Sequence, residues 1–130
     1  MSHPPLIAVI DDDHAMREAL VDLLEVYDFR CTSFDSARSF MGAHAITRFD
    51  AVITDLNLQG ESGLDLQQRI RSIDPDLPVI LISAQSDPCI RSEALRSGVL
   101  AFLLKPVDDQ VLHRHLISAL TRARRERTPP

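Results

Sequence analysis

Polar side chains able to do chemistry stand where several short apolar runs of the sequence end. Three aspartates, Asp11–Asp13, follow the first run, and Asp55 closes a later one. Ser83 and Lys105 stand at the ends of two more runs, and Lys105 is the only lysine of the chain. If these runs are neighbouring parallel strands, their carboxyl ends meet at one rim of the sheet. We therefore expect carboxylates, a hydroxyl and an ammonium group to share one site.

Carboxylates gathered in this way favour a divalent cation. Like-charged carboxylates do not lie side by side near neutral pH without a cation or a raised pKa. The expected ligands are oxygens, with no cysteine nearby and only His14 as a candidate imidazole, so Mg²⁺ is favoured over zinc. A carboxylate nucleophile, a lysine that neutralises charge and a hydroxyl donor are the parts needed for phosphoryl transfer to an aspartate.

A simpler interpretation assigns these residues no chemistry. Each aspartate would then cap a helix, and Lys105 would be a solvated loop charge. This explains any one residue easily, but it requires four strand ends to carry polar groups by coincidence. We do not predict a histidine metal site, because His14 falls in a first helical turn, and His113 and His115 are two positions apart and diverge on a helix.

The elements that must position these residues alternate along the chain. Continuous apolar runs are typical of strands buried on both faces of a parallel sheet. Arg30–Phe34 is more polar and alternating, which suits an edge strand. The four apolar runs are Leu6–Ile10, Ala51–Ile53, Val79–Ile82 and Leu100–Leu104.

Between the strands the apolar spacing is helical. The first helix has Asp13 as its cap, and another begins at Pro88 and ends at Gly98. A shorter helix is expected over Asp35–Met41, and the last from about Asp108. Five β-α units with right-handed crossovers predict an α/β fold, a doubly wound five-stranded parallel sheet with helices on both faces.

Composition and charge limit the function. The chain has 130 residues, 45% hydrophobic and 25% charged, which is ordinary for one globular domain. No apolar run approaches the roughly 20 residues of a membrane span, and Met1–Pro5 begins no secretory signal, so we expect a cytoplasmic protein with no membrane partner.

Cys31 and Cys89 lack a CxxC spacing, and we interpret both as buried small side chains.

The formal net charge of −5 is unevenly distributed. The last ten residues carry four arginines and one glutamate, a net +3, which leaves −8 for residues 1–120. This acidic body would be repelled by DNA, so direct DNA binding by this domain is not expected. We interpret residues 122–130 as a basic C-terminal extension or the start of a linker.

The strand-end motifs resemble one family. Val9–Asp13, Thr54-Asp55 with Gly63 eight residues on, Ser83-Ala84 and Phe102–Pro106 are similar to the receiver domain of two-component response regulators. The resemblance covers residues 5–121. Phe34–Phe40 is similar to the second helix of receivers that precede a helix-turn-helix DNA-binding output domain. The resemblance implies a flavodoxin-like fold with strand order 2-1-3-4-5.

The resemblance also implies an acceptor and a metal site. Asp55 would accept a phosphoryl group from a histidine of a partner kinase. Asp12, Asp55 and the main-chain carbonyl of Asn57 would bind Mg²⁺, with Asp11 acting through a metal-bound water. The domain would catalyse only its own phosphorylation and dephosphorylation, and would not otherwise be an enzyme.

Further roles follow from the same resemblance. Lys105 would pair with the phosphoryl oxygens, and the Ser83 hydroxyl and Ala84 amide would donate hydrogen bonds to them. Phe102 stands at the aromatic switch position, and would turn inward as Ser83 moves toward the phosphoryl group. The implied partners are a histidine kinase, a second copy through the fourth helix and fifth strand, and a DNA-binding output domain beyond residue 130.

Two positions depart from the family pattern. Leu58-Gln59 stand where the family usually has Met-Pro, and losing the proline removes a fixed φ and frees an amide. A looser loop over the metal is therefore expected. Ser83 replaces threonine, losing a methyl group and keeping the hydroxyl.

Other function classes differ from the phosphorylation switch in the residues that they require. A phosphate-independent protein-interaction module of the same fold is the main alternative, and the presence of Asp12, Asp55 and Lys105 argues against it. A Mg²⁺-dependent phosphohydrolase generally has an Asp-x-Asp pair and a cap insertion, which Asp55-Leu56-Asn57 and a 130-residue chain do not provide. Flavin binding requires Ser, Thr or Gly where this first strand leads into aspartates.

Overall fold

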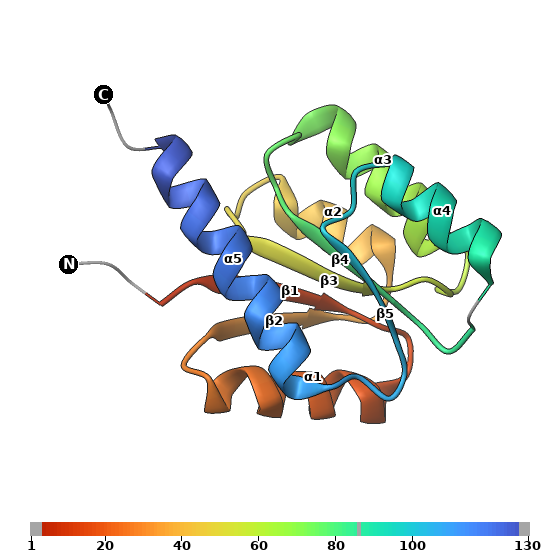
Figure 1. The fold of residues 1–130 in the computed structure, drawn as a ribbon, viewed down its shortest axis with the longest axis horizontal. Helices are drawn as coiled ribbons and strands as arrows, with labels where there is room; N and C mark the ends of the chain where they lie inside the picture. The colour runs from red at the N-terminus through yellow and green to blue at the C-terminus, as the bar shows by residue number, and fades with distance from the viewer. Residues whose placement is uncertain (1–3, 86, 128–130) are drawn as a thin grey trace.

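The computed structural model describes residues 4–85 and 87–127, with side chains to residue 121. Its five strands form one parallel sheet in the order β2-β1-β3-β4-β5, which confirms the predicted fold class and strand order (Figure 1). The strands are β1 (Leu6–Ile10), β2 (Arg30–Phe34), β3 (Ala51–Asp55), β4 (Val79–Ser83) and β5 (Ala101–Leu104).

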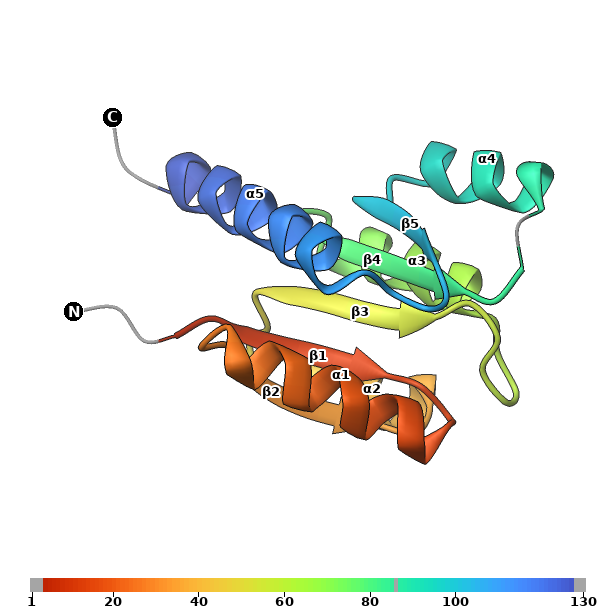
Figure 2. The same ribbon diagram turned by 60° about the horizontal axis from the view of Figure 1, so that its bottom comes forward.

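Five helices connect the strands and cover both faces of the sheet. Helices α1 and α5 lie on one face, and α2, α3 and α4 on the other (Figures 1 and 2). No helix in the described ranges is both long and apolar enough to cross a bilayer. The helices are α1 (His14–Val26), α2 (Ala37–His44), α3 (Gly63–Ile73), α4 (Pro88–Arg96) and α5 (Asp109–Arg127).

The cores on the two faces follow from the alternation of side chains along each strand. In β1, Ile7 and Val9 pack toward α1 and α5, where they meet Leu24 and Leu112. The intervening residues of β1 pack toward the other three helices. Because both faces are covered, β1 is apolar throughout, and β3 and β4 are apolar until the polar residues at their carboxyl ends, as the continuous runs predict.

Short polar side chains begin most of the helices. Asp13 accepts from the backbone amides of Ala15 and Met16 and so caps α1 as predicted. Ser62 caps α3, and Asp87 caps α4 immediately before Pro88. These caps fix where each helix starts after its strand, and therefore the length of each loop at the strand ends.

The prediction for the second helix is wrong at both ends. The expected segment Asp35–Met41 starts too early, because Ser36 accepts from the Ser39 amide and α2 begins after it. The helix then continues through Gly42 to His44. A glycine within a helix costs about 1 kcal/mol, and the full burial of Phe40 against the sheet outweighs that cost.

The expectation for one of the two cysteines is wrong, and the last helix extends into the basic C-terminal segment. Cys89 is exposed in the first turn of α4, so it is not a buried small side chain, whereas Cys31 is half-buried, and burial raises the pKa of its thiol to about 11. The C-terminal helix α5 runs through Arg127, so residues 122–127 are helical. The rest of the predicted extension, residues 128–130, lies outside the described residues.

Candidate phosphoryl-acceptor and metal site

The acidic residues meet at the carboxyl end of the sheet. Asp11 follows β1 directly, and Asp55 is the last residue of the neighbouring strand β3, where Ile10 pairs with Thr54. Asp11 and Asp55 are buried, with 1% and 7% of their surfaces exposed, while Asp12 is accessible to solvent. One carboxylate oxygen from each of the three lies within 4.8 Å of the other two.

Backbone amides orient the two buried carboxylates. The Asp13 amide donates to Asp11 Oδ1 at 2.9 Å, and the Asn57 amide donates to Asp55 Oδ1 at 3.4 Å. The Thr54 hydroxyl donates to the Asp55 carbonyl at 3.1 Å. In Asp55, Oδ1 therefore accepts from the loop that follows the strand, and Oδ2 faces Lys105.

Lys105 pairs with both buried carboxylates. Its Nζ lies 3.2 Å from Asp55 Oδ2 and 3.6 Å from Asp11 Oδ2. The lysine reaches them because β5 lies beside β4 and β4 beside β3, and the Lys105 amide donates to the Ser83 carbonyl at 2.8 Å. The predicted meeting of β1, β3, β4 and β5 ends is therefore observed.

The electrostatics of the cluster reflect its burial. Desolvation raises the pKa of Asp11, and the nearby carboxylates of Asp55 and Asp12 add to this, although the Asp13 amide and Lys105 oppose it. Desolvation works to lower the pKa of Lys105, but the Asp55 and Asp11 carboxylates outweigh it, so the pKa of the ammonium is raised. Lys105 thus pairs with two of the three clustered carboxylates, so their negative charge is not fully compensated.

The donor set fits Mg²⁺. Asp11, Asp12 and Asp55 offer only hard oxygen ligands within one small volume, and the accessible Asp12 leaves room for metal-bound waters. His14 is not part of this group, because its ring pairs with Glu18 at 3.1 Å on the surface of α1. Asn57 follows β3 and contacts Asp55 through its amide, which places it in the same loop.

Ser83 and Phe102 have different relations to the site. The Ser83 hydroxyl is fully buried, donates to the Gln85 carbonyl at 3.2 Å and accepts from the Gln85 amide at 3.0 Å. It is therefore engaged by its own loop, which also carries the exposed Ala84. Phe102 is 4% exposed and packs in the core on the α4 side, so its ring already points inward.

Contacts within the loop after Asp55 and with α3 restrain this loop, although it has no proline. Asn57 pairs with Ser62 in an isolated antiparallel bridge, and Gly60 takes a left-handed φ of 83° at the turn between them. Glu61 forms an ion pair with Arg69 on α3. These contacts restrain the segment that Gln59 was expected to loosen.

Gly63 brings α3 against the backbone of Asp55. Its amide donates to the Leu56 carbonyl at 2.6 Å, and a Cβ at this position would overlap the carbonyl oxygen of Asp55. Only glycine fits this close approach without a shift of the backbone.

Sequence reasoning missed one cation at the site. Arg17 on α1 donates from its guanidinium to the Asp11 carbonyl at 2.7 Å and also contacts His14 Nδ1 at 3.1 Å. The spacing between Asp13 and Arg17 could have predicted this contact. Arg17 stands one helical turn past the Asp13 cap, and the side chains of α1 point back toward the start of the helix.

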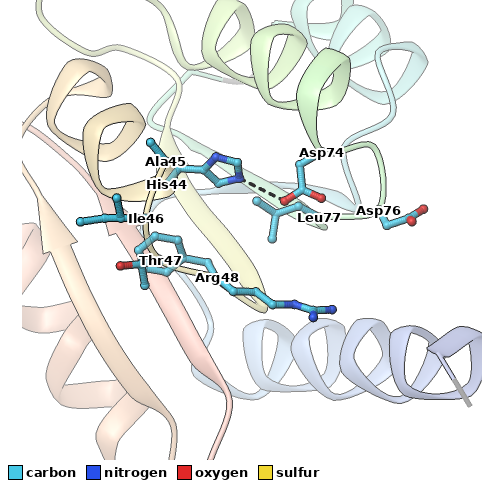
Figure 3. Close-up of a pocket in the computed structure, with 9 residues that line it drawn as sticks. His44, Ala45, Ile46, Thr47, Arg48, Asp74, Asp76 and Leu77 are labelled. Atoms are coloured by element: carbon cyan, nitrogen blue, oxygen red, sulfur yellow. Dashed lines mark hydrogen bonds and ion pairs between the residues drawn. The ribbon is translucent and has the colours of Figure 1, made fainter.

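A cavity of about 590 Å³ lies away from this site, between the ends of α2 and α3 (Figure 3). His44 and Asp74 contact each other at its wall, with Nε2 and Oδ2 3.0 Å apart, and Arg48, Asp76 and Leu77 also line it. These residues follow the C-terminal ends of helices or precede strands, so the cavity belongs to the opposite end of the sheet from Asp55.

Comparison with known proteins gives a consistent result. Residues 7–117 match the family described as "Response regulator receiver domain". The chain is 34% identical over 117 residues to the transcriptional regulatory protein FixJ of Bradyrhizobium diazoefficiens, covering 90% of this chain and 57% of that protein. It is 35% identical over 124 residues to the DNA-binding transcriptional regulator NtrC of Azospirillum brasilense, covering 95% of this chain and 25% of that protein.

Solved structures agree with the sequence matches. A full-length FixJ from B. japonicum superposes with a TM-score of 0.85 at 33% identity, covering 94% of this chain and 60% of that one. A response regulator receiver protein from Pseudomonas putida gives a TM-score of 0.85 at 32% identity, covering 91% of this chain and 99% of that one. The chain thus spans about half the length of FixJ and nearly all of an isolated receiver.

Proposed function

The chain belongs to the response regulator receiver domain family, and from that premise we propose that it is a phosphorylation-operated signalling switch. Asp55 accepts a phosphoryl group from a phosphohistidine of a partner kinase in a Mg²⁺-dependent reaction. The observation that carries the proposal is the direct pairing of Asp55 with Lys105, the chain's only lysine, beside two further carboxylates.

The transfer requires a nucleophile and charge compensation. An Asp55 carboxylate oxygen attacks phosphorus as the bond from phosphorus to the imidazole nitrogen of the donor breaks, and the donor leaves as neutral histidine after taking up a proton. Mg²⁺, when bound by Asp12, Asp55 and the Asn57 carbonyl, with Asp11 acting through water, supplies positive charge toward the phosphoryl oxygens. Lys105 supplies the protein's own cation on the same oxygens.

The switch residues connect the acceptor to the surface of α4 and β5. Once Asp55 carries phosphate, the Ser83 hydroxyl leaves Gln85 and, together with the Ala84 amide, donates to a phosphoryl oxygen. Phe102 is already buried in the core on the α4 side, so its movement is a shift within that core as Ser83 moves. The rearranged face then forms a homodimer or binds an output partner.

The regulated process is proposed from the relatives. FixJ and NtrC are named as transcriptional regulators, and this chain covers only part of each. We infer that the domain controls transcription through a DNA-binding output domain, while its own acidic body does not bind DNA.

Phosphorylation of the purified protein tests the proposal. Acetyl phosphate with Mg²⁺ should add one acid-stable, base-labile phosphoryl group, detected by intact mass, and EDTA should prevent it. Asp55→Asn should abolish the addition, since the amide is not a nucleophile. Asp76→Asn is the matched control, because it removes a carboxylate at the far end of the sheet and should label normally.

The alternative, a phosphate-independent interaction module, makes the opposite prediction. Unlabelled wild-type protein, or Asp55→Asn labelled as fast as wild type, would contradict the proposed acceptor. The first result would favour the interaction module, and the second would place the phosphoryl group on another residue.

A further inference from the structure

One buried polar side chain of the described residues lies outside the acceptor site. The others stand at or next to the strand ends around Asp55, where the proposed chemistry accounts for them. Gln67, on α3, is 3% exposed and takes no part in that chemistry. A buried amide side chain is costly unless it is hydrogen-bonded, so its partner is informative. The other four buried polar side chains of the described residues are Asp11, Thr54, Asp55 and Ser83.

Gln67 holds the C-terminal end of α4. Its Nε2 donates to the backbone carbonyl of Ser97, the C-cap residue of that helix, at 3.1 Å. Carbonyls at a helix C-terminus have no partner within the helix, and Gln67 supplies one from a neighbouring helix. The Ser97 hydroxyl in turn donates to the Ala94 carbonyl at 2.7 Å, which closes the last turn.

A second residue of α3 holds the next position of the chain. Arg71 lies one turn after Gln67 on the same face of α3, and its guanidinium covers Gly98 so closely that a Cβ there would overlap it. Gly98 has a left-handed φ of 97°, which ends α4 and turns the chain toward β5. Two consecutive residues are therefore in contact with side chains of α3: Ser97 is hydrogen-bonded to Gln67, and Gly98 lies against the Arg71 guanidinium.

The opposite end of α4 is attached differently. Its first turn follows the loop that starts at Ser83, and Asp87, Pro88 and Cys89 are all exposed. Arg91 reaches the Phe102 carbonyl on β5 at 3.4 Å, near the limit for a hydrogen bond. The N-terminal half of α4 thus follows the Ser83 loop and contacts the domain through the packing of Ile90 and this long hydrogen bond, whereas the C-terminal end is hydrogen-bonded to α3 through Gln67.

We propose that Gln67 and Arg71 form an anchor on α3 about which α4 turns when Asp55 is phosphorylated. The anchor keeps Ser97 and Gly98 in place. When Ser83 is displaced, the N-terminal half of α4 and β5 therefore move, while the C-terminal end of α4 does not. This proposal rests on the proposed function and deepens it by naming the fixed end of the moving helix.

Amide hydrogen exchange without phosphate or metal tests the anchor itself. Gln67→Met keeps the side-chain length and removes the donor, and Gln68→Met is the matched control because Gln68 is exposed on the same helix. Exchange at residues 97–100 should rise about five- to tenfold in Gln67→Met, as expected when opening no longer breaks a buried hydrogen bond. Arg71→Met, a change at an exposed residue, should raise exchange in the same segment.

Equal exchange at residues 97–100 in Gln67→Met and Gln68→Met would overturn the anchor. If Gln67→Met fails to fold, Arg71→Met decides the same point. These comparisons use no phosphate mimic, so they stand whatever happens to the proposed acceptor.

Beryllofluoride with Mg²⁺ tests the turning of α4. In wild-type protein, exchange should change at residues 87–93 and 101–104 and stay constant at residues 97–100, whereas in Gln67→Met the change should spread into residues 97–100. Equal changes along the whole of α4 in wild type would overturn the fixed end. No change anywhere would overturn the turning together with the proposed function, while leaving the metal-free result on the anchor intact.

Discussion

At the scale of single residues, the site is a balance between crowded carboxylates and one ammonium group. Lys105 lies within ion-pair distance of Asp55 and Asp11, and its raised pKa keeps it protonated well above neutral pH. A raised lysine pKa contributes stability that is present below its ordinary value of 10.5 and is lost as pH rises through the higher folded value. Asp12 has no such partner among the ion pairs of the described residues.

Asp12→Asn separates metal binding from stability. Asp12 contributes repulsion that raises the pKa of Asp11, so removing its charge should leave the metal-free melting temperature unchanged or raise it. Because Asp12 is proposed as a direct ligand, the change should weaken Mg²⁺ binding at least about tenfold, in line with a change of roughly 1.4 kcal/mol. Titration calorimetry and thermal melts in EDTA measure the two effects.

Asp13→Asn is the control for charge. It removes the same charge one residue further on, and asparagine caps a helix as well as aspartate. Its Mg²⁺ affinity should stay close to that of wild type. A lower metal-free melting temperature for Asp12→Asn with unchanged Mg²⁺ affinity would show that Asp12 is structural.

At the scale of elements, the junction between β3 and α3 sets the shape of the acceptor. Asp55 ends the strand, and eight residues later Gly63 returns to within contact of its backbone. The Asn57–Ser62 bridge and the Glu61 ion pair hold the intervening turn. The position of the acceptor therefore depends on how closely the first residue of α3 approaches β3.

Gly63→Ala should destabilise the fold and slow phosphorylation. Alanine favours a helix by about 1 kcal/mol over glycine, but the new Cβ would overlap the Asp55 carbonyl oxygen, and such overpacking costs typically about 1–3 kcal/mol. The cost of this overlap should exceed the gain in helix propensity, so the variant should have a lower melting temperature and a slower rate of labelling by acetyl phosphate.

The control for Gly63→Ala is Gly42→Ala. Gly42 lies within α2 with open space around its Cα, so the same substitution should stabilise the protein and leave labelling unchanged. If Gly63→Ala were also stabilising, the close approach of α3 to Asp55 would not be a constraint on the site.

At the scale of the whole molecule, the two ends of the sheet have different roles. The carboxyl end holds the acceptor and leads through β4 and β5 to α4, whereas the amino end holds the His44–Asp74 pair and its cavity (Figures 2 and 3). Large apolar side chains are exposed at several places, including Leu95 on α4, 44% exposed, and Leu104 on β5, 43% exposed. Exposed apolar side chains on α4 and on β5, the strand that carries Phe102, suit a phosphorylation-dependent interface.

Leu95→Asp should prevent phosphorylation-dependent self-association. Beryllofluoride should convert wild-type protein to a dimer in sedimentation velocity, and a charge on the α4–β5 face should keep the variant monomeric. Mg²⁺ affinity and acetyl phosphate labelling should not change, because Leu95 is remote from the carboxylates.

Ile46→Asp provides the comparison for Leu95→Asp. Ile46 is 88% exposed and lies by the cavity at the amino end of the sheet, so this variant should dimerise normally. Dimerisation of both variants to the wild-type extent would place the interface elsewhere.

Much of the fold could be predicted because local patterns and tertiary demands coincide. Continuous apolar runs indicated strands covered on both faces, and Asp13 and Pro88 marked helix starts that the structure confirms. Boundaries were less certain where burial outweighs local preference, as in α2, which continues through Gly42 because Phe40 is buried. The exposure of Cys89 depends on which face of α4 meets the sheet. The residue type alone does not specify that face.

The sequence by itself determined which residues end the strands, and parallel pairing then brings those ends to one rim. Tertiary structure alone decided the distances: Lys105 reaches Asp55 because register places Ser83 opposite Leu104 and Asp55 opposite Ile82. The contacts of Arg17 with the Asp11 carbonyl and of Gln67 with Ser97 also required the fold. Each depends on where a long side chain meets a backbone carbonyl, and side-chain direction and helix packing, rather than residue type, fix that point in space.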